Sequence, residues 1–165
     1  MLAHKILFPT DFSPASEEAM QWATSLCRDT GATMVIVHVE EPPMAYGGGE
    51  LYYGLEDDTS RDELRKHLAS VIPTDPQVPF EHMLLLGDPA KAIAEIADRQ
   101  QADMIVLGTH GRTGITRLLM GSVAEAVVRQ AKCPVLTIKQ PVEVQEAAAM
   151  GSTRQPQWDR CMPPG

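Results

Sequence analysis

Cysteine, aromatic residues and positive charge are all scarce in this sequence. It has 3 cysteines, 5% aromatic residues, and 14 Lys and Arg against 22 Asp and Glu, which gives a formal net charge of −8. Three widely separated cysteines form neither a zinc pattern nor a disulfide framework, so we expect a reduced, cytoplasmic protein. An acidic chain also lacks the basic face that contacts nucleic-acid phosphates, which argues against a nucleic-acid partner.

Long hydrophobic runs are absent as well. No apolar stretch approaches the roughly 20 residues that span a bilayer. The first apolar run, Ile6–Phe8, stops at Pro9, so we expect no signal peptide. The acidic charge balance argues against a polybasic membrane patch, and we expect no membrane association.

What the sequence does contain is an alternation of short β-branched segments with segments of helical periodicity. Strands are expected at 5–8, 33–39, 80–86, 104–107 and 135–138, and four helices between them. Such alternation is typical of parallel βαβ units. Right-handed crossovers then predict an α/β fold with three α/β/α layers and a doubly wound, five-stranded parallel sheet. Residues 1–140 form the predicted domain, and residues 141–165 are expected to be a flexible C-terminal tail.

Local signals predict where the helices begin and what they bury. Ser13 and Asp88 each precede a proline, as an N-cap does, and Ser60–Glu63 matches a capping box. Gly31 suits a left-handed helix end. The apolar faces of the first and fourth helices are expected to bury Ala19, Trp22, Ala23, Leu26 and Cys27, and Val123, Ala126 and Val127.

Glycines follow the fourth expected strand rather than the first. The turn at 9–13 contains no glycine, so the dinucleotide-binding fingerprint is unsupported, and no P-loop motif occurs. Gly108, Gly111 and Gly121 would let a ligand approach the backbone, and Ser122 opens a helix whose N-terminus can bind an anion. Ser122–Glu125 also fits a capping box, which needs no ligand. The residues alone leave both interpretations open.

The glycine spacing resembles a known motif. Gly108-x2-Gly111-x9-Gly121-Ser122 is similar to the ATP-binding motif of the universal stress protein family. Five further segments resemble that family in order, over roughly residues 4–139: Ile6–Asp11, His38–Val39, Gly87–Pro89, Asp103–Gly108 and Cys133–Leu136.

The resemblance implies a site as well as a fold. The fold would be adenine nucleotide alpha hydrolase-like, with strand order 3-2-1-4-5, and the ligand would be ATP, with or without Mg²⁺. By this resemblance, Pro9, Thr10 and Asp11 would line the adenosine end of the ligand, and the backbone of Val39 would contact adenine. Leu107, Gly108 and Gly111 would flank the nucleotide, and Gly121, Ser122 and Val123 would hold the phosphates. Thr109, His110 and Arg112 lie within the motif. The charge of Arg112 suits phosphate. No catalytic residue and no metal ligand is assigned.

Three functions agree with these residues. The first is a universal stress protein that binds ATP and acts in the stress response through nucleotide-dependent binding and signalling. The second is a slow ATPase or autophosphorylating enzyme, for which Asp11, His110 and Ser122 are candidate parts. The third is an interaction domain without nucleotide.

The last strand favours a homodimer. Strand 135–138 would end the sheet with apolar residues on both faces, and such an edge invites pairing with another chain. Members of the family that the sequence resembles commonly pair these strands. The alternative is that the segment after Gln140 covers the edge.

Overall fold

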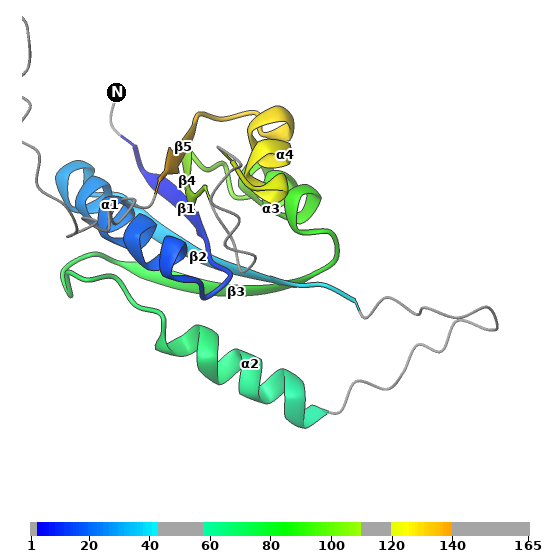
Figure 1. The fold of residues 1–165 in the computed structure, drawn as a ribbon. Coiled ribbons are helices and arrows are strands. Elements are labelled where there is room, and N and C mark those ends of the chain that lie inside the picture. The colour runs from blue at the N-terminus through cyan, green and yellow to red at the C-terminus, as the bar shows by residue number, and fades with distance from the viewer. Residues whose placement is uncertain (1–2, 43–57, 110–119, 140–165) are drawn as a thin grey trace, which may run out of the picture.

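The computed structural model describes residues 3–42, 58–109 and 120–139 (Figure 1). In these ranges the chain alternates strands and helices. The strands are β1 (Lys5–Pro9), β2 (Thr33–Glu40), β3 (Phe80–Leu86), β4 (Met104–Gly108) and β5 (Val135–Ile138). The helices are α1 (Pro14–Thr30), α2 (Asp58–Ser70), α3 (Pro89–Arg99) and α4 (Ser122–Gln130).

All five strands are parallel and form one sheet in the order β3-β2-β1-β4-β5. The predicted fold class and strand order are therefore confirmed. β1 lies at the centre, where Leu7 faces Val35 of β2 on one side and Ile105 of β4 on the other. These residues are fully buried, which agrees with near-continuous apolar strands covered on both faces.

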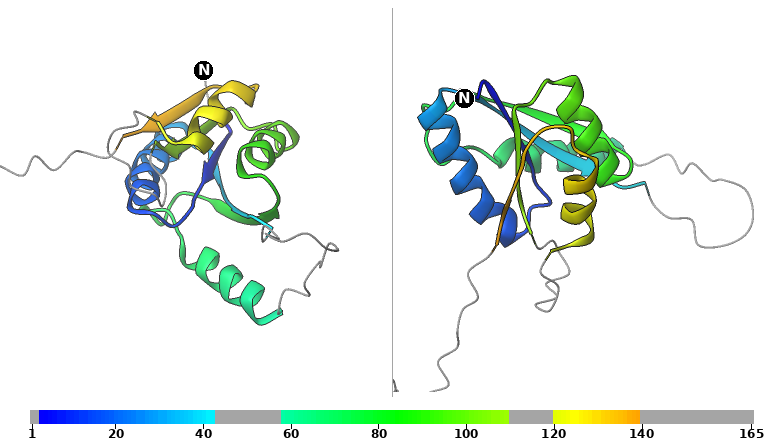
Figure 2. Two further views of the ribbon diagram at one scale, coloured as in Figure 1. Left: turned by 45° about the vertical axis from the view of Figure 1, so that its right-hand side comes forward. Right: turned by 90° about the horizontal axis from the view of Figure 1, so that it is seen from above.

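Helices cover both faces of the sheet. Figure 2 shows α1 on one face and α3 and α4 on the other. Buried residues of α1, together with Leu68 of α2, pack against Ile6, Phe8 and Ile36 on the first face. Buried residues of α3 and α4 pack against Leu7 and Ile105 on the second face. Two separate cores therefore hold the three layers together.

The predicted caps of α1 and α3 are confirmed. The Ser13 side chain accepts a hydrogen bond from the Ser16 N–H, and that of Asp88 accepts one from the Lys91 N–H at 2.9 Å. Gly31 ends α1 with φ at 74°, a conformation that glycine adopts without strain. The turns at both ends of α1 are thus fixed by local sequence.

Three local predictions were wrong. Helix α2 begins at Asp58, so Ser60 lies inside its first turn rather than at the N-cap. Trp22 is 53% exposed, because α1 meets the sheet through its small residues, including Ala19 and Ala23. Val123 is 39% exposed, and Ala124 is buried beside Val127 in its place.

The predicted C-terminal tail, residues 141–165, lies outside the described residues. Within the described ranges, no helix has the length and apolar character needed to cross a membrane.

Candidate functional site

The carboxyl ends of β1 and β4 lie side by side at the centre of the sheet. The chain leaves β1 towards β2 and leaves β4 towards β5, so the two connections diverge from this point. Open parallel sheets bind ligands in the crevice at such a switch point. Five residues predicted as site residues lie in these two strand ends or directly after them: Pro9, Thr10, Asp11, Gly108 and Thr109.

The turn after β1 holds Asp11 through a compact hydrogen-bond network. The Asp11 Oδ1 accepts hydrogen bonds from the Ser13 N–H at 3.1 Å, the Ser13 hydroxyl at 2.6 Å and the Ser16 hydroxyl. Thr10 is buried, and its N–H donates to the Val37 carbonyl at 2.8 Å. Oδ2 of Asp11 receives no hydrogen bond from the described residues. One oxygen thus anchors the turn, while the other is available to a ligand.

These hydrogen bonds also fix the charge of Asp11. Partial burial opposes ionisation of the carboxyl group. The hydroxyls of Ser13 and Ser16 and the Ser13 N–H outweigh burial, so the pKa of Asp11 lies below its ordinary value of 3.8. Asp11 is therefore a carboxylate at neutral pH. A carboxylate suits the hydroxyl groups of a sugar and repels a phosphate.

Phe12 takes part in this turn, although sequence reasoning gave it no role. Its φ is 62°, the left-handed region that a bulky side chain rarely adopts. Its ring stacks on His67 of α2 at a centroid distance of 4.1 Å and lies 4.3 Å from the His38 ring. Nδ1 of His38 in turn donates to the Thr10 carbonyl at 2.8 Å. No sequence signal marks a phenylalanine for this conformation; the packing holds it there.

Val39 offers backbone groups at the same edge. β2 continues to Glu40, whereas β1 ends at Pro9, which faces Val37. The Val37 carbonyl bonds towards β1, and in a parallel ladder alternate residues face the same neighbour. The N–H and C=O of Val39 therefore face the space beyond β1, and no described residue bonds to them. A donor and an acceptor side by side suit the edge of a planar base.

Gly108 has a structural role that its place in the motif did not reveal. A Cβ at this position would lie 2.7 Å from the Ala15 carbonyl oxygen and 2.9 Å from its carbonyl carbon. Only a glycine lets the first turn of α1 approach β4 this closely. Leu107, beside it, is buried in the core between the sheet and α3 and α4, so its side chain does not line an open crevice.

The two ends of the segment between β4 and α4, Thr109 and Gly121, are hydrogen-bonded to each other. Thr109 is buried, and its N–H donates to the Ile138 carbonyl at 2.8 Å. Its own carbonyl accepts from the Gly121 N–H at 2.6 Å. This pair of bonds sets the N-terminus of α4 beside the end of β4.

The start of α4 has no side-chain cap from its own N-cap residue. That residue is Gly121, and none of the described side chains bonds to the first-turn amides. Of the two interpretations that the sequence left open here, the capping box at Ser122–Glu125 does not form: Ser122 is the first helical residue, and Glu125 pairs with Arg129 at 2.6 Å. Gly121 has φ −69° and ψ 155°, values open to any residue, so its backbone does not require glycine.

Three predicted residues of the motif, His110, Gly111 and Arg112, lie outside the described residues. Across the ranges that the structure describes, no group of three His, Cys, Asp or Glu side chains could hold a metal ion.

Comparison with known proteins identifies the family. The model of the universal stress protein family matches residues 3–139. The chain belongs to the universal stress protein family. A universal stress protein of Methanocaldococcus jannaschii is 37% identical over 145 residues, which cover 85% of this chain and 84% of the relative.

Solved structures of the family agree with the architecture. A universal stress protein from Lactobacillus plantarum superimposes with a TM-score of 0.66 at 27% identity, covering 82% of this chain and 97% of that one. A universal stress protein from Archaeoglobus fulgidus, solved in complex with dAMP, superimposes with a TM-score of 0.62 at 27% identity. The match covers 84% of this chain and 100% of that one. The family fold thus accounts for nearly the whole of the described structure.

Proposed function

We propose that this universal stress protein binds ATP, together with Mg²⁺, in the crevice at the carboxyl ends of β1 and β4. The observation that carries the proposal is the start of α4. Its amides have no side-chain cap among the described residues, and Gly121 is a glycine without any backbone need for one. A helix N-terminus of this kind favours a phosphate group. The dAMP complex of the Archaeoglobus relative supports an adenine nucleotide as the ligand.

The remaining groups suit the other parts of the nucleotide. The carboxylate of Asp11 would accept hydrogen bonds from ribose hydroxyls through Oδ2, since Oδ1 is already engaged. The backbone of Val39 would meet the edge of adenine. The amides of Ser122 and Val123, with Arg112, would meet the phosphates. Pro9, Thr10, Leu107 and Gly108 would shape the walls, and Thr109, His110 and Gly111 the loop above them.

We further propose that the protein acts in the stress response as a nucleotide-dependent homodimer, in the cytoplasm, rather than as an enzyme. The dimer would form along the free edge of β5. The Ile105 N–H donates to the Pro134 carbonyl, and the Thr109 N–H donates to the Ile138 carbonyl. These two bonds fix the phase of the ladder, that is, they show that the even-numbered residues of β5 bond to β4. In that phase, Val135 and Thr137 present their backbone groups outwards. A two-fold axis would pair these groups with their copies.

The test is nucleotide binding by the intact protein and by a phosphate-site variant. Nucleotide released from the purified, denatured protein should be ATP, and Mg-ATP at 100 times its Kd should stabilise the fold by about 2.7 kcal/mol. That free energy corresponds to a rise in Tm of roughly 5–11 °C.

Gly121→Val supplies the structural arm of the test. The backbone angles at position 121 are allowed for valine, so we expect the ligand-free variant to have a Tm close to that of the wild type. Mg-ATP should not raise the Tm of this variant. Gly121→Ala is the matched control and should lose only part of the gain. A Gly121→Val protein that binds ATP normally would show that the phosphate site lies elsewhere, and a wild type without any shift in millimolar Mg-ATP would contradict ATP binding itself.

A further inference from the structure

The free edge of β3 presents a complete row of backbone groups. The Met34 N–H donates to the Pro79 carbonyl at 2.8 Å, and the Gly87 N–H donates to the Glu40 carbonyl at 3.0 Å. With the register of β2 and β3, these two bonds place the odd-numbered residues of β3 in the ladder. The N–H and C=O of Phe80, His82, Leu84 and Leu86 therefore point away from the sheet, and no described residue bonds to them.

Among the described residues, this edge has few of the features that usually prevent strand pairing, and its one acidic side chain, Glu81, pairs with Lys5 at 3.7 Å. β3 is seven residues long, Phe-Glu-His-Met-Leu-Leu-Leu, with no lysine, proline or glycine inside it. Phe80 is 42% exposed and Leu86 is 54% exposed. Long, apolar, unprotected edge strands are rare in folded proteins unless something pairs with them.

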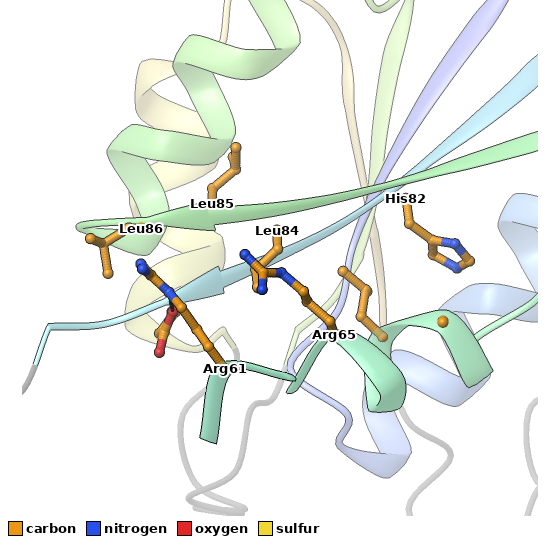
Figure 3. A pocket seen from close by; sticks show the side chains of 9 residues that line it. Arg61, Arg65, His82, Leu84, Leu85 and Leu86 are labelled. Atoms are coloured by element: carbon orange, nitrogen blue, oxygen red, sulfur yellow. Dashed lines mark hydrogen bonds and ion pairs between the residues drawn. The ribbon is translucent and has the colours of Figure 1, made fainter. Parts of the chain in front are cut away.

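A groove runs along the same edge. It has a volume of about 540 Å³ and is lined by Glu40, Arg61, Arg65, Leu68, Ala69, His82 and Leu84–Leu86. Figure 3 shows Arg61 and Arg65 extending from α2 towards β3, with Leu84 facing them across the groove. The groove therefore has an apolar wall on the strand and guanidinium groups on the helix.

The groove carries two guanidinium groups, each of which has a carboxylate partner. Arg61 pairs with Glu40, from Nε to Oε2, at 3.2 Å. Arg65 pairs with Asp62 on its own helix at 3.0 Å, and both of these side chains are about 60% exposed. An exposed pair of this kind contributes little free energy, so Arg65 can exchange Asp62 for another carboxylate at little cost.

We propose that β3 and this groove bind an extended segment of a partner protein, which adds a sixth strand to the sheet. Its backbone pairs with Phe80, His82, Leu84 and Leu86. Its groove-facing side chains are apolar apart from an acidic one that reaches Arg65. Strand addition gains affinity from the backbone and specificity from alternate side-chain pockets.

A second copy of this strand is a poorer occupant. The side chains that β3 places on the α2 face are Phe80, His82, Leu84 and Leu86, and none of them is acidic. Glu81 lies on the opposite face. Two copies of β3 would therefore bring Arg65 no carboxylate to replace its exposed pair with Asp62, whereas a partner with an acidic residue at this position would bring one.

The test uses a fluorescein-labelled seven-residue peptide that alternates threonine with leucine, glutamate and leucine in that order. Fluorescence anisotropy with the full chain should show saturable binding below about 1 mM. Arg65→Glu should weaken binding at least about tenfold through like-charge repulsion. Lys66→Glu is the matched control, because Lys66 is exposed and does not line the groove; it should leave the Kd unchanged within about twofold.

The backbone contribution is tested separately. Leu86→Pro removes an outward N–H without touching the bonds between β2 and β3, so it should also weaken binding about tenfold, whereas Leu86→Ala keeps the N–H and should not. Methylation of the peptide nitrogens on one edge should abolish binding, and methylation on the other edge should not.

Four results would overturn the proposal. The first is no binding by the wild type, and the second is equal binding by wild type, Arg65→Glu and Leu86→Pro. The third is binding that appears only after residues 43–57 are replaced by a Gly-Ser linker, because this result would mean that residues 43–57 of the wild type occupy the groove. The fourth is a fall from dimer to monomer on Leu86→Pro in sedimentation, because the edge would then pair with a second copy.

Discussion

Replacement of Gly108 by alanine tests how closely the end of β4 packs against the first turn of α1. The new Cβ would sit 2.7 Å from the carbonyl oxygen of Ala15 and 2.9 Å from its carbonyl carbon. Real Cβ atoms do not approach so closely, and the obstacle is backbone, so the first turn of α1 must move. Overpacking of this kind typically costs about 1–3 kcal/mol. For a chain of this size, a loss near 2 kcal/mol lowers Tm by roughly 4–8 °C.

The same movement should reach the proposed nucleotide site. Ser13 and Ser16 stand at the start of α1 and hold Asp11. A shift of that turn therefore displaces the carboxylate, and we expect Gly108→Ala to weaken ATP binding as well as to lower Tm. The assay is thermal unfolding with and without Mg-ATP, together with calorimetric titration.

Two controls isolate the cause. Gly31→Ala at the other end of α1 meets no atom within 4 Å but keeps φ at 74°, so it should cost about 1 kcal/mol of strain and leave ATP affinity unchanged. Adding Ala15→Gly to Gly108→Ala should restore little, because the closest atoms belong to the Ala15 backbone. An unchanged Tm in Gly108→Ala, or full rescue by Ala15→Gly, would refute the reasoning.

Two further predictions concern Asp11 and the β5 edge. Hydrogen bonds lower the pKa of Asp11 below 3.8, so its stabilising contribution is complete above that pH and disappears as the pH falls through the folded-state pKa. Thermal melts of Asp11→Asn should therefore lie below the wild type at pH 7 and approach it as the pH falls below 3.8; a difference in Tm that stays constant as the pH falls would contradict the assignment. In β5, Thr137→Pro removes an outward N–H and should convert the proposed dimer to a folded monomer in light scattering. Leu136→Pro removes the N–H that the ladder phase directs at Ile105, and should instead lower Tm; dimers that survive Thr137→Pro would place the interface elsewhere.

Much of the architecture followed from the chain itself. The segment at 33–39 became a strand, because a central strand that helices cover on both faces needs apolar residues nearly throughout. The segments at 80–86 and 135–138 became strands with these bounds at the two edges of the sheet. The caps at Ser13, Gly31 and Asp88 also followed, since each depends on one side chain or one φ value within a turn. The glycine spacing located the end of β4 and the start of α4.

Other features depended on packing between distant segments. No local pattern could show that Trp22 points outwards, because its burial depends on which face of α1 meets the sheet. The left-handed Phe12 is held by His38 and His67, which are 26 and 55 positions further along the chain by sequence number.

The candidate site also combines features that the sequence predicts with features that only tertiary packing decides. The sequence determined which residues are candidates for the proposed site: an acidic turn after the first strand, and glycines after the fourth. Only the tertiary structure decided what each one does. Gly108 is a glycine because Ala15 lies against it, Asp11 is ionised because Ser13 and Ser16 bond to it, and Ser122 is not a cap because Gly121 takes that position. These roles arise where α1 and α4 meet the central strands, and the position of one element against another is a property of the assembled core.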